Sequence, residues 1–156
     1  MRHYTRALAL LLFLFLLHLW QTRDAVDGQA PPLKARLVSG EQFTLATGEK
    51  PILVYFWATW CPVCGLTSGS IDTLAKESSV VTIAMQSGDE AEVTAHLENK
   101  ALTFPVVNDP QGRIAKEWGV RGVPTIYILD KQGKIRFVSV GYTTSLGLRA
   151  RLWLAD

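Results

Sequence analysis

Two cysteines, Cys61 and Cys64, are the only ones in this 156-residue chain, and they stand three positions apart. They follow an apolar, β-prone run at residues 51–56 and precede a segment with helical periodicity. On the first turn of a helix, cysteines at positions i and i+3 can close a disulfide and reopen it. The unpaired N–H groups and the positive end of the helix dipole also stabilise a thiolate there. The spacing therefore predicts redox chemistry at a strand-to-helix turn.

Other sites use the same cysteine spacing, and the neighbouring residues weigh against most of them. Haem attachment needs a histidine directly after the second cysteine, where this chain has Gly65. Structural zinc needs four ligands, but there is no third cysteine and the histidines are His3, His18 and His96. We interpret His96 as a surface residue of a helix. Two thiolates can bind Cu(I), so a copper-binding redox module stays open as an alternative.

The two cysteines are predicted to have different roles. We expect Cys61 at the N-cap of the helix with its sulfur exposed, as the catalytic nucleophile. Cys64 lies one turn further in and would resolve the mixed disulfide. Pro62 suits the first helical turn, where its missing N–H costs nothing. A peroxidase is less favoured, because a second cysteine one turn away suits exchange better than peroxide capture, and exchange needs no diffusible cofactor and no metal.

The composition indicates a single globular domain, with 48% hydrophobic and 19% charged residues. Arg2 and Arg6 account for the formal net charge of +2 and precede an uncharged apolar run at residues 7–20. No stripe of basic residues interleaved with aromatics follows, so nucleic-acid binding is not expected. Two cysteines are also too few for a disulfide scaffold.

The apolar run predicts a membrane anchor. Extended to residues 4–22, a helix would nearly span the roughly 30 Å hydrocarbon core, with some thinning or snorkelling. The arginines before it favour a cytoplasmic N-terminus and place the rest of the chain outside. A cleaved signal peptide is the alternative, although residues 28–30 make a poor cleavage site. We therefore divide the chain into an anchor at 1–23, a tether at 24–32 and a domain at 33–156.

The rest of the chain alternates between strand and helix patterns. The continuous apolar run at residues 52–57 predicts a strand buried on both faces. Together the patterns indicate an α/β fold with a central mixed β-sheet flanked by helices. We predict strands at 35–38, 42–45, 52–57, 80–85, 104–108, 125–129 and 134–140, and helices after Cys61 and at 90–99, 112–118 and 145–154.

Residues 56–64, Phe-Trp-Ala-Thr-Trp-Cys-Pro-Val-Cys, resemble the active-site segment of the thioredoxin superfamily, and residues 122–125, Gly-Val-Pro-Thr, resemble its cis-proline loop. Residues 102–105 with Asp109 resemble the strand–helix insert of the membrane-anchored TlpA/ResA/CcmG branch. Within that branch, Cys-Pro-Val-Cys and residues 84–89 are most similar to the suppressor-of-copper-sensitivity protein D (ScsD-like) group of bacterial disulfide oxidoreductases.

The resemblance implies a thioredoxin-like fold and a periplasm-facing protein disulfide oxidoreductase, single-pass in the inner (cytoplasmic) membrane. Its substrates would be cysteine-containing proteins, and a thiol–disulfide partner in the membrane would exchange electrons with it. A thiol reductant for cytochrome c maturation is the alternative within the same branch. The resemblance also implies a cis bond before Pro124, beside Cys61, whose backbone edge could pair with an extended substrate strand. The substrate-binding residues it implies are Trp60, Pro62, Val123, Pro124 and Thr125.

Two departures from the family pattern concern proton transfer. Thioredoxins commonly carry a buried acid where this chain has Tyr55, and related reductases carry a glutamate after the second cysteine, where residues 65–70 offer none. A buried carboxylate can move the proton of the inner thiol. Water, Tyr55 and Thr125 remain as alternatives for that role, and the direction of the reaction stays open.

Overall fold

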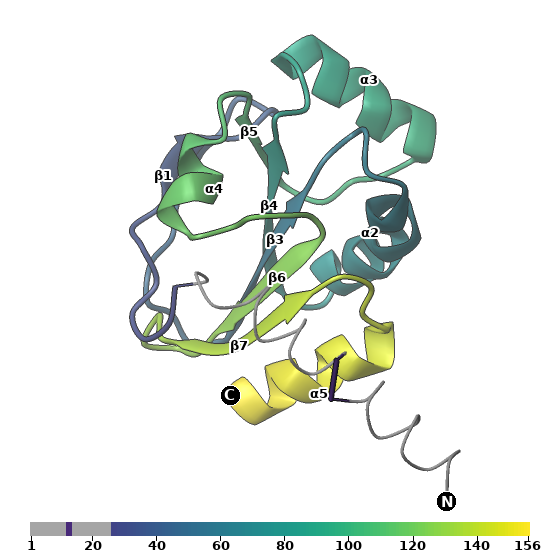
Figure 1. The fold of residues 1–156 in the computed structure, drawn as a ribbon. Helices are drawn as coiled ribbons and strands as arrows, with labels where there is room; N and C mark the ends of the chain where they lie inside the picture. The colour runs from purple at the N-terminus through teal and green to yellow at the C-terminus, as the bar shows by residue number, and fades with distance from the viewer. Residues whose placement is uncertain (1–11, 14–25) are drawn as a thin grey trace, which may run out of the picture.

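The computed structural model describes residues 12–13 and 26–156 (Figure 1). The predicted anchor at residues 1–23 lies outside the described residues, apart from Leu12 and Phe13. In the part of the chain that is described, no helix is both long and apolar enough to cross a membrane.

The predicted elements are confirmed, with ends that shift by about two residues at most. In chain order they are β1 (Lys34–Arg36), β2 (Gln42–Thr44), β3 (Ile52–Trp57), α2 (Pro62–Ala75), β4 (Ser79–Met85), α3 (Glu90–Lys100), β5 (Val106–Asp109), α4 (Arg113–Glu117), β6 (Thr125–Leu129), β7 (Ile135–Val140) and α5 (Ser145–Ala155).

A mixed five-stranded sheet forms the centre of the fold, in the order β5-β4-β3-β6-β7 (Figure 1). Strands β3, β4 and β5 are parallel, whereas β6 and β7 run antiparallel to their neighbours. The helices α2 and α5 lie on one side of the sheet, and α4 lies with β1 on the other (Figure 1). The short strands β1 and β2 pair with each other as the predicted hairpin.

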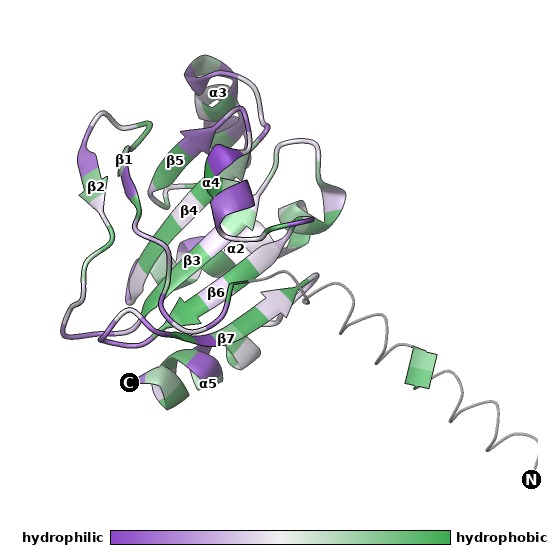
Figure 2. Ribbon diagram, turned by 60° about the vertical axis from the view of Figure 1, so that its left-hand side comes forward, coloured by the Kyte–Doolittle hydropathy of each residue, from purple (hydrophilic) through white to green (hydrophobic). Residues whose placement is uncertain are grey.

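The central strand β3 supplies both cores, because successive side chains of a strand point to opposite faces. Tyr55 and Trp57 pack with residues of α2 and α5, whereas Val54 and Phe56 pack with residues of α4. All four are fully buried. In Figure 2, β3 and β6 are predominantly hydrophobic, and the exposed helix α4 is largely hydrophilic. A strand covered on both sides needs this continuous apolar run.

The pairing of β3 with its neighbours brings the loops of the site together. Phe56 pairs with Thr125 at the start of β6, and Trp57 pairs with Ala84 near the end of β4. The chain therefore leaves β3 toward Cys61 at the same edge where the chain enters β6.

Part of the predicted tether lies against the domain. The Val26 N–H donates to the Trp118 carbonyl at 3.4 Å, and the Ala30 N–H donates to the Gly133 carbonyl at 3.0 Å. The Ile135 N–H in turn donates to the Gly28 carbonyl at 2.7 Å. These backbone bonds hold residues 26–30 on the domain.

A capping box begins α3. Asp89 accepts a hydrogen bond from the Glu92 N–H at 2.9 Å, and the Glu92 carboxylate accepts one from the Asp89 N–H at 2.8 Å. Two N–H groups that lack helical partners are thereby satisfied.

Replacing Asp89 with Ala should lower the free energy of unfolding by about 1 kcal/mol, because the cap is lost. Urea denaturation at neutral pH measures the change. Glu98→Gln, on the exposed side of the same helix, is the matched control and should leave the midpoint of urea denaturation unchanged. Equal midpoints for Asp89→Ala and the control would contradict the role of the cap.

Candidate active site

The cysteine pair lies at the turn from β3 to α2. Cys61 is the N-cap of α2, with extended backbone angles, and Pro62 follows at the first helical position. The Cys61 sulfur accepts a hydrogen bond from the Cys64 N–H at 3.2 Å. The two sulfurs are joined in a disulfide. An N-cap sulfur that receives a helical N–H is well placed to carry negative charge when the disulfide is opened.

The two cysteines differ in access. The exposed fraction is 9% for Cys61 and 1% for Cys64, so Cys61 is less exposed than we expected because the loop before β6 lies against it. The Cys61 sulfur lies 3.6 Å from the Val123 carbonyl oxygen, and the bond between Val123 and Pro124 is cis. An incoming sulfur can therefore approach Cys61 at the edge formed by the loop before β6, whereas Cys64 is covered.

The loop before β6 is held by its own hydrogen bonds. The Thr125 hydroxyl donates to the Gly122 carbonyl at 2.7 Å, and the Pro124 carbonyl accepts from the Gly141 N–H at 2.8 Å. Pro124 and Thr125 are buried, and Val123 is half-buried. Among the described residues, the Val123 N–H has no backbone partner. Of this loop, Val123 is the residue that offers backbone groups next to Cys61.

Trp60 forms an exposed wall of the site. Its side chain is 59% exposed, and its indole N–H donates to the Gln86 carbonyl at 3.0 Å. The preceding Thr59 N–H donates to the Ser87 hydroxyl at 3.1 Å. The loop between β4 and α3 thus fixes the segment that leads into Cys61.

An exposed apolar rim continues from Trp60 along the first turns of α2. Val63 is 41% exposed and Leu66 is 70% exposed. Neither residue was among those predicted for the site. Their spacing of three on a helix, away from the buried Cys64, was the available signal.

Tyr55 occupies the space beneath the inner cysteine. Its hydroxyl lies 3.2 Å from the Ser68 hydroxyl and donates to the Cys64 carbonyl at 3.3 Å. Burial raises the pKa of Tyr55 to about 12, although the hydrogen bond with Ser68 acts in the opposite direction. Tyr55 is therefore protonated at neutral pH, and its hydroxyl contacts the backbone of α2.

A cavity of about 210 Å³ opens beside the disulfide, between α2 and α3. Cys61 and Cys64 line it from one side, and His96 and Lys100 line it from the other. The His96 ring stacks on Trp57 with 5.4 Å between ring centroids and an angle of 34°.

His96 lies partly exposed on α3, as a surface residue of a helix, but its contact with Trp57 and its place beside the cavity were not predicted. The residue is half-buried, because its neighbours come from β3 and α2, far away in the sequence. Burial lowers the pKa of His96, and the positive charge of Lys100 lowers it further.

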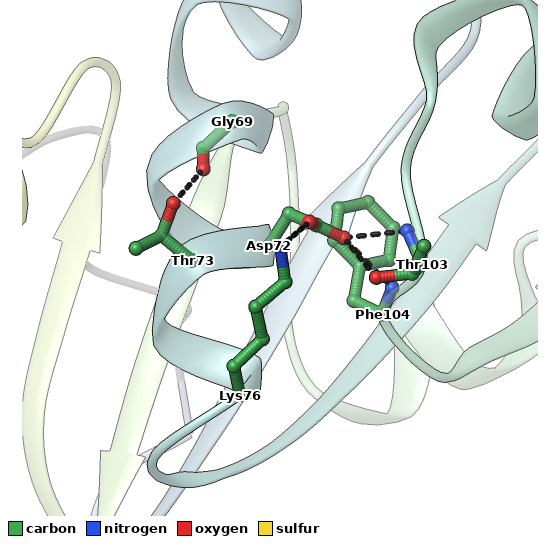
Figure 3. A network of polar contacts seen from close by, with 6 residues as sticks. All are labelled: Gly69, Asp72, Thr73, Lys76, Thr103 and Phe104. Carbon is green, nitrogen blue, oxygen red and sulfur yellow. Dashed lines mark hydrogen bonds and ion pairs between the residues drawn. The ribbon is translucent and has the colours of Figure 1, made fainter.

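The acid of α2, Asp72, serves another part of the fold (Figure 3). Its carboxylate accepts hydrogen bonds from the N–H groups of Thr103 and Phe104 at 2.5 and 3.0 Å and from the Thr103 hydroxyl at 3.0 Å. The Lys76 ammonium nitrogen lies 3.4 Å from the other carboxylate oxygen of Asp72. Asp72 is two turns beyond Cys64 and is not among the residues that line the cavity. It ties α2 to the segment before β5.

Several known proteins have sequences similar to this chain. The sequence model of the AhpC/TSA family matches residues 26–138. A thioredoxin-like protein of Haemophilus influenzae is 39% identical over 137 residues, which cover 86% of this chain and 81% of that protein. The thiol-disulfide oxidoreductase ResA of Geobacillus thermodenitrificans is 28% identical over 137 residues, which cover 85% and 79% respectively.

A solved structure extends the comparison to the fold. The pneumococcal exposed lipoprotein thioredoxin of Streptococcus pneumoniae matches with a TM-score of 0.68 and 27% sequence identity, over 80% of this chain and 99% of that one. The mixed sheet and the disulfide at the start of α2 are consistent with the names of these relatives. This chain belongs to the AhpC/TSA family, and it is a thioredoxin-like enzyme of thiol–disulfide exchange.

Proposed function

We propose that this enzyme is a membrane-tethered oxidoreductase that exchanges disulfides with cysteine-containing proteins outside the cytoplasm, with Cys61 as nucleophile and Cys64 as resolving thiol. The observation that carries the proposal is the disulfide at the N-terminus of α2, in which Cys61 keeps a small exposed area and Cys64 is covered. In the reducing direction, the Cys61 thiolate attacks a substrate disulfide and releases one substrate thiolate. Cys64 then displaces the second substrate sulfur, and the Cys61–Cys64 bond forms.

The surface around Cys61 suits an extended protein segment. The Val123 backbone can pair with a substrate strand beside the Cys61 sulfur, as in β-strand addition. Trp60 and Pro62 flank Cys61 in the chain and are exposed, whereas Pro124 and Thr125 are buried within the loop before β6. The apolar rim of Trp60, Val63 and Leu66 offers hydrophobic contact to residues that flank a substrate cysteine.

The N-terminal sequence supports the proposed placement of the enzyme. Residues 1–23 would anchor it in the inner membrane, with the domain in the periplasm and a membrane thiol–disulfide protein as electron partner. An oxidising compartment allows the disulfide to persist. The sequence Cys-Pro-Val-Cys, together with residues 84–89, supports membership of the ScsD-like group. The likeness to an exposed lipoprotein of Streptococcus pneumoniae fits an extracytoplasmic site.

A redox titration of the full-length chain in detergent against glutathione buffers tests the chemistry. We expect one two-electron transition that involves both cysteines, and no transition in Cys61→Ser. A potential of about −120 mV would identify an oxidant, and one of about −270 mV a reductant. A chain without a titratable dithiol and without exchange on a disulfide peptide would refute the proposal.

The topology needs a separate test. Reduced Cys61 in intact spheroplasts should react with a membrane-impermeant maleimide, and the protein should stay with the membrane after an alkaline carbonate wash. Labelling only after lysis would place the domain in the cytoplasm. Release by carbonate would refute the anchor.

A further inference from the structure

The exchange proposed for Cys61 and Cys64 requires the inner thiol to lose a proton before it attacks, and to regain one in the reverse reaction. The hydroxyl groups of two residues near the pair already make other hydrogen bonds. The Tyr55 hydroxyl bonds to the Cys64 carbonyl and to Ser68, and it is protonated at neutral pH because its pKa is raised to about 12. The Thr125 hydroxyl donates to the Gly122 carbonyl. Neither group is free to accept the proton.

The cavity between α2 and α3 offers a different route. The ionisable side chains that line it, besides the cysteines, are His96 and Lys100, and no carboxylate is among the described residues of its wall. Both come from successive turns of α3. The volume of about 210 Å³ is ample for water, since a water molecule needs about 10–15 Å³ on such a measure. The stack on Trp57 holds the imidazole of His96 toward this space.

We propose that His96 is the proton-transfer residue of this enzyme, and that it accepts the proton of the Cys64 thiol through water in the cavity and returns it in the reverse reaction. The inference rests on the roles proposed above for Cys61 and Cys64. It adds the group that serves the resolving step.

Resolution in the reducing direction conserves both protons and electrons. After Cys61 has formed a mixed disulfide, the Cys64 thiol gives its proton to His96, which becomes an imidazolium. The Cys64 thiolate then attacks the Cys61 sulfur, so that the Cys61–Cys64 bond forms and the bond to the substrate sulfur breaks. The substrate sulfur leaves as a thiolate and takes the proton from the imidazolium or from solvent. The enzyme dithiol is oxidised, and the substrate disulfide is reduced by two electrons.

The charges around His96 suit an acceptor. Its lowered pKa, due first to burial and then to Lys100, keeps the imidazole neutral at neutral pH. On its own helix, Glu92 precedes it by one turn, with its carboxylate engaged by the Asp89 N–H. On the opposite side, α2 presents Cys61 and Cys64, and Tyr55 on β3 is protonated. Resolution should therefore slow as the pH falls through the pKa of His96.

Two variants of His96 test the proposal in the full-length chain. His96→Gln keeps polarity without a titratable base, and His96→Phe keeps a ring to stack on Trp57. The lifetime of the mixed disulfide with a disulfide peptide is measured by rapid alkylation and mass spectrometry. We expect it to lengthen by about 100-fold or more at pH 7 in both variants. At strongly alkaline pH the variants should approach the wild type, because hydroxide can then remove the thiol proton without a side-chain base.

Lys100→Gln supplies a second measurement that does not disturb the packing, because Lys100 is exposed. Loss of its charge should raise the pKa of His96, so the acid limb of the resolution rate should move to higher pH. The His96 ring signal in proton NMR, identified by its absence in His96→Gln, should move in the same direction. An unchanged acid limb in Lys100→Gln, or wild-type lifetimes in both His96 variants, would overturn the inference.

The test also separates this inference from the proposed function. A Cys61→Ser variant with wild-type exchange would refute the roles of the cysteines themselves. Wild-type resolution that depends on Cys64 but not on His96 would refute only the inference.

Discussion

Replacing Cys61 with Ser should reduce thiol–disulfide exchange to the uncatalysed rate. A serine hydroxyl is far less acidic than a thiol and cannot form a disulfide, so both the nucleophile and the covalent intermediate are lost. The helix N-terminus and the Val123 carbonyl edge remain, but they have no thiolate to act on. Exchange with a fluorescent disulfide peptide, followed in the full-length chain, measures the loss.

Cys64→Ser should behave differently, because the attacking cysteine is retained. The Cys61 thiolate still forms a mixed disulfide, but the serine cannot displace the substrate. We expect covalent enzyme–substrate adducts on non-reducing gels that disappear on addition of dithiothreitol. The double variant Cys61→Ser/Cys64→Ser is the matched control and should trap nothing. Full activity in both single variants, or adducts of equal yield in Cys61→Ser and Cys64→Ser, would contradict the assignment of the pair.

Local sequence signals were sufficient for most of the fold. The run at residues 52–57 is continuous and apolar, and it forms the central strand with the predicted ends. The strand predicted from residue 104 begins at Val106 instead. The Pro105 carbonyl accepts bonds from the Thr82 N–H and hydroxyl, but a proline has no N–H to continue the ladder.

The cysteine pair could be predicted from its spacing alone, but the residues that contact it in the folded structure could not. His96 follows Cys64 by a strand and much of a helix, and no periodicity connects the two. The β3–β4 register places the end of β3 near the start of α3, and only then does the imidazole meet Trp57. The same holds for Tyr55, whose position in the strand was predicted but whose contact with Ser68 depends on how α2 packs.

Replacing Asp72 with Ala should lower the free energy of unfolding by about 3 kcal/mol. The carboxylate is nearly buried and satisfies the N–H groups of Thr103 and Phe104 (Figure 3). Its loss would leave these donors without their acceptor, and hydrogen bonds to charged groups contribute about 1.5–3 kcal/mol each. Urea denaturation at neutral pH measures the change.

The adjacent residue provides the matched control for this prediction. Thr73 lies on the exposed side of α2, and its hydroxyl bonds back to the Gly69 carbonyl of the same helix (Figure 3). Thr73→Ala should not destabilise the protein, because alanine is the better helix former. Exchange activity of folded Asp72→Ala should equal that of the wild type, since Asp72 does not line the cavity beside the cysteines. A large loss of activity in the folded variant would place Asp72 in the proton pathway instead.

The pH dependence of this stability difference should show whether the ionised carboxylate of Asp72 causes it. Burial alone would raise the pKa of Asp72, but the hydrogen bonds from Thr103 and the charge of Lys76 outweigh it and hold the pKa below its ordinary value. A carboxyl group whose pKa is lowered in the folded state stabilises the protein above the pKa of the unfolded chain, and that contribution is lost as the pH falls through the folded value. The difference in stability between the wild type and Asp72→Ala should therefore be full at pH 7 and shrink below about pH 4. A difference that stays constant down to acid pH would mean that lost packing, and not the ionised carboxylate, causes the destabilisation.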